Sequence, residues 1–184
     1  MSTAFLISIS PVYAAFPIAH VVRTAGDSLS ASKSNTVDFI ARDFVTENIK
    51  ALGHITALVA LFGAICSTVG WVLNSDGMAI DPILMDSFDY AYALPTGAAI
   101  AFLEMIRLDF IGGILETFNG WDLTGSGASG YNINGLVAVG YEYVQVILIL
   151  AKLYLALAIY HFFYGILSTL TRWIQKPSLP FKTS

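Results

Sequence analysis

The sequence predicts an all-α integral membrane protein, and three features of its composition support that fold class. Apolar residues make up 56% of the 184 residues. Charged residues make up only 12%, whereas soluble globular proteins carry roughly 25%. The mean hydropathy of +0.70 points the same way. Because a soluble domain of this size needs more charge to cover its surface, we expect residues 1–184 to form a single membrane domain.

Two long apolar stretches are predicted to cross the bilayer. The first is residues 51–73, which contain no charged residue. The second is residues 136–170, in which Glu142 and Lys152 are the charged residues. A membrane-spanning helix needs about 20 predominantly apolar residues, so both stretches are long enough.

Residues 4–22 form a third candidate, at the N-terminus. The stretch is uncharged, but Pro11 and Pro17 would kink a helix or divide it into short pieces. We therefore expect a bent or half-inserted membrane helix. A secretory signal peptide is disfavoured, because the stretch has no basic residues at its start, and we expect it to be retained.

Residues 35–50 are predicted to form an amphipathic helix. Asn35 or Thr36 is expected to cap it, with Asp38 favourable in the first turn. Two interpretations remain open: the helix lies along the membrane interface before residues 51–73 begin, or it docks on another subunit. Its apolar stripe at helical spacing comprises Val37, Ile40, Ala41, Phe44, Val45 and Ile49.

The distribution of charge predicts an orientation. Residues 74–134 carry eight acidic residues and one basic residue, Arg107. Seven of the other Lys and Arg residues lie in residues 23–50 and in the C-terminal tail, residues 171–184. By the positive-inside rule, these two basic segments share the cytoplasmic-type side of the membrane, and residues 74–134 lie on the opposite side.

That orientation bears on residues 97–118, a further stretch long enough to span. Two crossings between the basic segments satisfy the positive-inside rule, and three do not. We therefore expect residues 97–118 to form a re-entrant or interfacial helix, although its length would also permit a crossing. The stretch carries Glu104, Arg107, Asp109 and Glu116, and Glu104 and Arg107 are spaced to pair with each other.

Small residues follow one face of residues 51–73. Such a strip lets a second helix approach closely, and close packing drives helix association in lipid. The partner helix could belong to this chain, to another copy or to a different subunit, and a lipid-facing strip is the alternative. The strip includes Gly53, Ala57, Ala60, Gly63 or Ala64, Ser67 and Gly70.

Lys152 lies in the middle of the most apolar part of the chain. An unpaired cation near the bilayer centre costs on the order of 3 kcal/mol. We therefore expect Lys152 to be enclosed by protein and paired with a carboxylate. Asp109 and Glu116 are the candidates within the chain, and a carboxylate of another subunit is the alternative.

The three histidines could hold a cofactor. In the predicted orientation, His20, His54 and His161 lie toward the same side of the membrane, and histidines from separate helices can ligate haem or a chlorophyll-type pigment. No two of them share a helix at a spacing of four residues. The alternative is a set of interfacial or hydrogen-bonded histidines.

No catalytic constellation or metal-ligand spacing is evident, and we expect the protein not to be an enzyme. The basic residues are spread along the chain, which argues against a nucleic-acid surface. The favoured function is a structural or accessory subunit of a larger membrane complex, in contact with other subunits or copies of itself and with bound lipid. The alternatives are a haem-, quinone- or pigment-binding membrane subunit and a self-assembling coat, pilin or pore protein built from helical hairpins.

Overall fold

The computed structural model describes residues 3–74, 82–120 and 131–175, and these residues are helical apart from short connections, with no strand among them. The predicted all-α class is therefore confirmed. In chain order the helices are α1 (Thr3–Ala31), α2 (Thr36–Asp38), the π-helix η1 (Phe39–Phe44), α3 (Val45–Val72), α4 (Pro82–Met105), α5 (Asp109–Asn119) and α6 (Ile133–Gln175).

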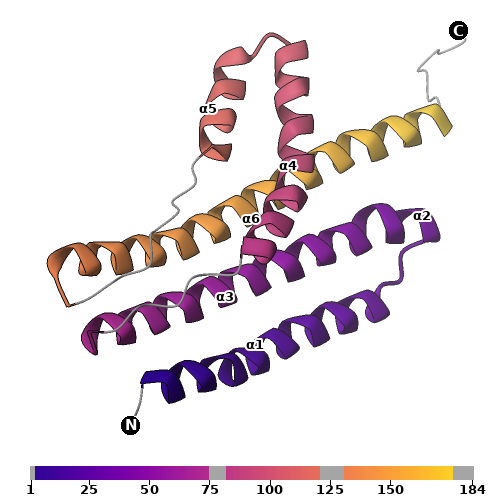
Figure 1. Ribbon diagram of the computed structural model, residues 1–184. Helices are drawn as coiled ribbons and strands as arrows, with labels where there is room; N and C mark the ends of the chain where they lie inside the picture. Colours follow the sequence, from indigo (N-terminus) through magenta and orange to yellow (C-terminus); the bar gives the residue numbers. More distant parts are fainter. Residues whose placement is uncertain (1–2, 75–81, 121–130, 176–184) are drawn as a thin grey trace, which may run out of the picture.

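The three long helices α1, α3 and α6 form a layer (Figure 1). Helix α3 lies between α1 and α6, packs on both and runs antiparallel to each. Helices α4 and α5 form a hairpin that stands away from the layer, and α4 contacts both α3 and α6. The buried apolar core lies between α3 and α6.

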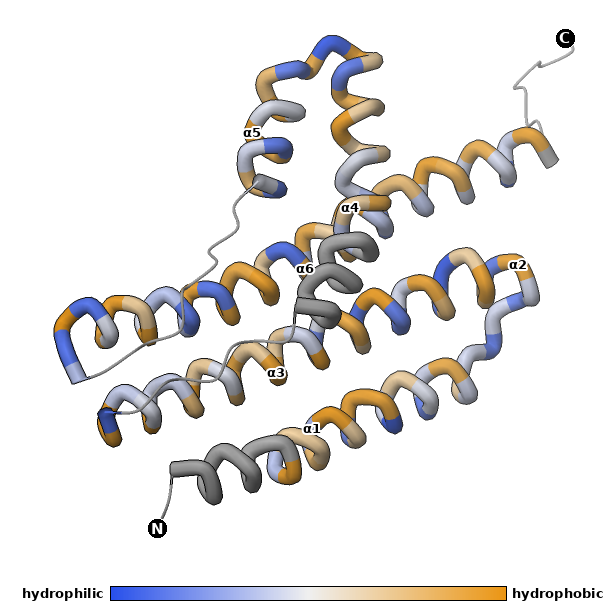
Figure 2. The backbone as a smooth tube through the Cα atoms, in the orientation of Figure 1, coloured by the Kyte–Doolittle hydropathy of each residue, from blue (hydrophilic) through white to orange (hydrophobic). Residues whose placement is uncertain are grey.

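Within the described residues, two helical stretches are long and apolar enough to cross a membrane. They are Thr36–Val72 and Ile133–Ile174, and they contain most of the predicted spans 51–73 and 136–170. Hydrophobic residues recur along the length of both (Figure 2). Helix α3 ends at Val72, where Asn74 adopts a left-handed φ of 52°, a conformation that Asn tolerates at helix ends.

The N-terminal helix is longer than predicted and is continuous. Helix α1 runs without interruption through Pro11 and Pro17 and continues to Ala31, so the division into short pieces does not occur. A proline removes one backbone donor, but helices in an apolar setting accommodate such a loss by local adjustment. Nine residues beyond the predicted end at Val22 are helical as well.

The prediction of a separate helix at residues 35–50 was wrong. Asn35 caps the helix as expected, since its side-chain oxygen accepts hydrogen bonds from the backbone N–H groups of Val37 and Asp38 at 3.1 and 3.0 Å. The helix then continues through η1 into α3 as one stretch, Thr36–Val72. No proline or glycine lies between Asn35 and Gly53, so the sequence supplies no stop at residue 50.

The prediction of one helix at residues 97–118 was also wrong, because the chain turns back at residues 106–108. Arg107 has a left-handed φ of 63°. The N–H of Leu108 bonds the carbonyl of Leu103, and the N–H of Arg107 bonds that of Glu104. This is the Schellman pattern that terminates helices. Residues 97–118 therefore comprise the end of α4, the turn and nearly all of α5, and α4 begins at Pro82, a favourable first helical position for proline.

Candidate functional site

The small-residue strip of α3 packs on α6 of the same chain. Leu153 of α6 lies directly over Gly53, where a Cβ atom would come within 2.5 Å of Leu153 Cδ1. Around this contact, Ile49, Val146, Ile149 and Leu157 complete the apolar core with the alanines of the strip. The strip residues Ala57, Ala60, Gly63, Ala64, Ser67 and Gly70 are all buried. At least part of the strip therefore packs against a helix of the same chain.

Polar contacts fix the register of α3 on α6 at the end near residues 71 and 132. The hydroxyls of Thr68 and Tyr143 are 3.1 Å apart. The indole Nε1 of Trp71 donates to the carbonyl of Asn132 at 2.9 Å, and the indole ring stacks on Tyr131 with a centroid distance of 4.7 Å. Because these contacts depend on facing positions of the two helices, a slip along the axis would break all of them.

Lys152 is buried, with 6% of its surface exposed. Its Nζ donates to the carbonyl of Asn119, the last residue of α5, at 3.3 Å. It also lies 5.6 Å from the centre of the Tyr92 ring on α4. A helix C-terminus carries partial negative charge, and the face of an aromatic ring attracts a cation. Lys152 therefore anchors the base of the α4–α5 hairpin to α6.

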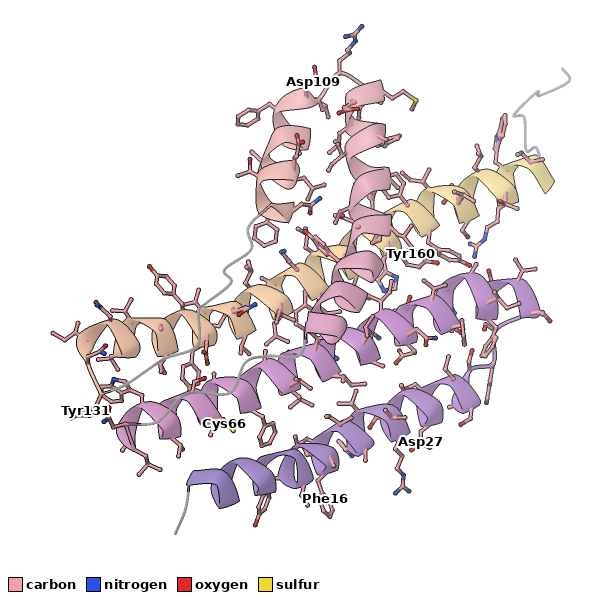
Figure 3. The ribbon with its side chains drawn as sticks, viewed as in Figure 1. Phe16, Asp27, Cys66, Asp109, Tyr131 and Tyr160 are labelled. Carbon is pink, nitrogen blue, oxygen red and sulfur yellow. The ribbon has the colours of Figure 1, made fainter. Side chains whose placement is uncertain are left out.

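The predicted carboxylate partners of Lys152 lie elsewhere. Asp109 is at the tip of the hairpin (Figure 3) and Glu116 is also exposed. Among the side chains that the structure describes, which begin on α4 at Tyr92, no ion pair involves Lys152, and none joins Glu104 to Arg107. The expectation of Asp109 or Glu116 as the partner of Lys152 is corrected in favour of a helix C-terminus and a ring. Sequence reasoning did not find these partners, since a backbone carbonyl and a tyrosine give no charge signal.

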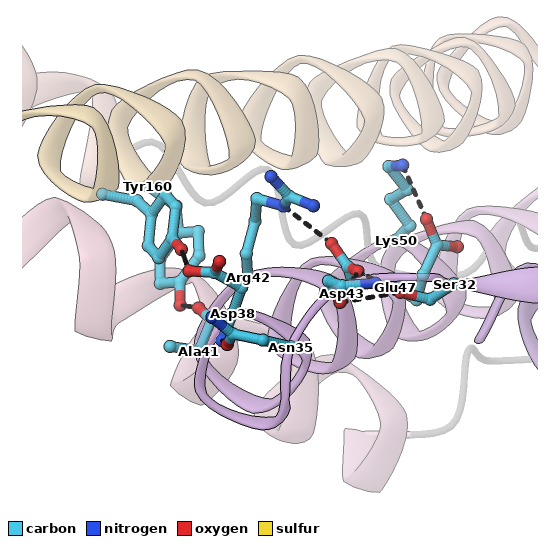
Figure 4. Close-up of polar contacts among 11 residues, drawn as sticks. Ser32, Asn35, Asp38, Ala41, Arg42, Asp43, Glu47, Lys50 and Tyr160 are labelled. Atoms are coloured by element: carbon cyan, nitrogen blue, oxygen red, sulfur yellow. Dashed lines mark hydrogen bonds and ion pairs between the residues drawn. The ribbon is translucent and has the colours of Figure 1, made fainter. Parts of the chain in front are cut away.

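A second polar cluster joins the start of the Thr36–Val72 helix to α6 (Figure 4). The Tyr160 hydroxyl donates to the carbonyl of Ala41, inside the π-helix η1. The Tyr164 hydroxyl donates to the carboxylate of Asp38. The two tyrosines, one turn apart on α6, therefore hold the wide turn of η1 in place. Turns of this kind are rare and occur often at functional positions.

Asp43 connects η1 to the link between α1 and α2. Its carboxylate accepts hydrogen bonds from Arg42 Nε at 2.7 Å, from the Ser34 hydroxyl at 2.7 Å and from the Ser32 hydroxyl (Figure 4). Asp43 lies in the polar first part of the helix, before the apolar residues 51–72 begin. The Arg42 guanidinium, together with the two hydroxyls, holds the pKa of Asp43 below its usual value.

The three histidines lie on different helices of the layer, and the structure does not gather them at one point. His20 of α1 and His161 of α6 are exposed, and α3 lies between their helices. His54 of α3 is half-buried, with Nδ1 2.7 Å from the carbonyl of Lys50 and its ring edge-to-face with Tyr154. In the part of the chain that the structure describes, no group of three His, Cys, Asp or Glu side chains is arranged to hold a metal ion.

An apolar groove of about 660 Å³ lies between the α4–α5 hairpin and α6. Its walls are almost entirely hydrocarbon, and they include Phe102, Phe118 and Phe163. The Phe102 and Phe163 rings meet edge-to-face at 5.4 Å. The groove offers no polar group for orienting a reactant.

The described residues thus form an all-helical protein with two helices that are long and apolar enough to cross a membrane, joined by tight packing and a few polar contacts. Comparison with known proteins gives no match to a family model, to a curated protein or to a solved structure.

Proposed function

We propose that the chain is an integral membrane protein that serves as a non-catalytic structural subunit of a larger membrane assembly. Helices α3 and α6 cross the bilayer as an antiparallel pair in this proposal. The wide exposure of large apolar side chains outside the α3–α6 core suits a lipid environment.

The observation that carries the subunit role is the length of α6. Its 43 residues correspond to about 64 Å of helix, whereas a bilayer with its headgroups is about 40–45 Å thick. Even a tilt of about 40°, the upper end of the usual range, leaves a height of about 49 Å. At least one end of α6 therefore projects beyond the lipid.

Both ends of α6 carry exposed apolar side chains. Ile133 is 79% exposed at one end, and Ile174 is 66% exposed at the other, with Val137 and Leu170 exposed nearby. Whichever end of α6 projects beyond the lipid, its exposed apolar side chains lie outside the bilayer. Clustered apolar surface outside lipid marks a protein contact, so a partner subunit is expected to cover it.

Paired lysine substitutions at each end test this proposal. One variant carries Ile133→Lys and Val137→Lys, and the other carries Leu170→Lys and Ile174→Lys. Ile147→Lys, at an exposed position between the ends, is the control for membrane insertion. We expect one end variant to insert normally and lose its co-purifying partners, and Ile147→Lys to impair insertion. Two end variants that both retain the native particle size would contradict the proposal.

The orientation of the chain belongs to the same proposal. Residues 23–50 and the tail 171–184 lie on the cytoplasmic-type side, and Asn74 and Tyr131, which are hydrogen-bonded at the other end of the α3–α6 pair, lie opposite. The excess of basic residues in the first two segments supports this. A particle composed of this chain alone would instead indicate the self-assembling coat, pilin or pore alternative.

A further inference from the structure

The face of α6 that packs on α3 contains a buried acid. Glu142 is 4% exposed, and Gln145, one turn along the helix, is 6% exposed. The fully buried Ser67 of α3 lies opposite, with its hydroxyl beside the Glu142 carboxyl. However, neither Ser67 Oγ nor Glu142 Oε2 makes a hydrogen bond of ordinary geometry.

No cation balances this carboxyl in the described part of the chain. The ion pairs there join Arg23 to Asp27, Arg42 to Asp43 and Lys50 to Glu47. On its own helix, the nearest basic side chain is Lys152, ten residues or about 15 Å along the axis, and it is engaged with α4 and α5.

The described side chains of the facing elements bring no charge close either. On α3, the nearest charged or basic residue to Ser67 is His54, thirteen residues away, or about 20 Å along the helix. On α4, Tyr92 lies at the level of Lys152 rather than of Glu142. Ser67 is thus the polar group that faces the carboxyl across the interface.

An ionised carboxylate in this position would be costly, because burying an uncompensated charge costs several kcal/mol. The neutral acid has an O–H group that can donate to Ser67 Oγ, which would satisfy both unpaired oxygen atoms with one bond. Glu142 is 4% exposed and Ser67 is fully buried, so only a very small species has room beside the carboxyl.

We propose that Glu142 and Ser67 form a proton-binding site in the α3–α6 interface, occupied at neutral pH. In the binding step Glu142 Oε2 takes a proton from a hydronium ion, which leaves as water, and the new hydroxyl donates to Ser67 Oγ. Glu142 lies nine residues after Ile133, the first residue of α6, and water at this end of the helix pair supplies the proton. Loss of the proton leaves a buried charge and weakens the pairing of α3 with α6.

The test uses a hydrophobic carbodiimide, which modifies buried carboxyls only in their protonated form, on the full chain in mild detergent. Peptide mapping by mass spectrometry locates the label in the native sequence without a variant. We expect Glu142 to be labelled at neutral pH, the yield to fall at least tenfold as the pH is raised, and the exposed Asp109 and Glu116 to remain unlabelled. Absence of label at Glu142 at neutral pH would overturn the proposal.

Two further measurements separate a proton from other occupants. Replacement of choline chloride by sodium or potassium chloride at constant ionic strength should leave the labelling unchanged, and protection by either cation would show a cation site instead. Glu142→Gln should remove the infrared band of a protonated carboxyl that the native protein shows. An unchanged spectrum in Glu142→Gln would also contradict the proposal.

Discussion

Leu153 of α6 fills the space above Gly53 of α3, where a Cβ atom would lie 2.5 Å from Leu153 Cδ1 and 2.8 Å from Leu153 Cδ2. Leu153 is fully buried, so its side chain has little freedom to move aside. The absence of a side chain at position 53 is therefore what allows the two candidate membrane helices to approach so closely.

Gly53→Ala is expected to destabilise the α3–α6 pair by about 1–3 kcal/mol through overpacking, although alanine favours helix over glycine by about 1 kcal/mol. Gly165→Ala is the matched control, since a Cβ at that position on α6 meets nothing within 4 Å. Thermal unfolding in detergent measures both. Equal stability of the two variants would show that this contact does not limit packing.

The contact also predicts a rescue. Leu153→Ala creates a cavity and should cost about 2–5 kcal/mol alone, but it removes the atoms that Gly53→Ala would meet. The double variant should therefore be less destabilised than the sum of the single variants. Strict additivity in thermal unfolding would mean that the two positions do not touch.

Lys152 should be coupled to Tyr92 and not to Asp109 or Glu116. A double-mutant cycle of Lys152→Met and Tyr92→Leu is expected to give a coupling of about 0.5–2 kcal/mol, the range for a partly desolvated cation–ring pair. The cycle of Lys152→Met with Asp109→Asn or Glu116→Gln should give none. A larger coupling energy in either carboxylate cycle than in the Tyr92 cycle would instead support the ion pair predicted from the sequence.

Removal of the hydroxyls that hold η1 should loosen the start of the Thr36–Val72 helix. Tyr160→Phe loses a bond to the Ala41 carbonyl, worth about 0.5–1.5 kcal/mol, and Tyr164→Phe loses a bond to the charged Asp38, worth about 1.5–3 kcal/mol. Amide hydrogen exchange at residues 39–44 should accelerate in both. Tyr154→Phe, at an exposed position on α6, is the control. Faster exchange at residues 39–44 in Tyr154→Phe as well would argue against a specific role for the Tyr160 and Tyr164 hydrogen bonds.

The lowered pKa of Asp43 predicts a loss of stability in acid. Because the folded state keeps Asp43 ionised to a lower pH than the unfolded state does, its contribution is complete above the unfolded pKa, near 4. The contribution is lost as the pH falls toward the folded value. Asp43→Asn should unfold at a lower temperature than the native protein at pH 7, with the difference shrinking below pH 4. A difference independent of pH would show that the charge of Asp43 is unimportant.

Local patterns predicted much of the helical framework. The long uncharged run at residues 51–73 specified a helix, and Asn35 specified where it begins, because a side-chain cap needs only its own backbone neighbours. The end of the helix at residue 50 was mispredicted, since a change from polar to apolar residues is not a stop signal. The turn at Arg107 was missed because arginine carries no sequence preference for a left-handed conformation.

The partners of the buried polar groups were harder to predict from the sequence. The depth of Lys152 in an apolar run indicated that it needs an enclosure, but its partners, the Asn119 carbonyl and the Tyr92 ring, depend on how the hairpin folds back. Glu142 lies next to two exposed tyrosines in the sequence. Only the packing of α3 on α6 shows that Glu142 faces Ser67 and is enclosed.

The mass of the native particle tests most directly whether the chain is a subunit of a membrane assembly. The protein is extracted from its own membrane in mild detergent at native abundance, and its mass is measured with the detergent contribution subtracted. We expect a particle well above the 19.8 kDa of the chain, with partner proteins in fixed, low stoichiometry. A monodisperse monomer, free of other proteins and intact in its fold, would contradict the proposed role.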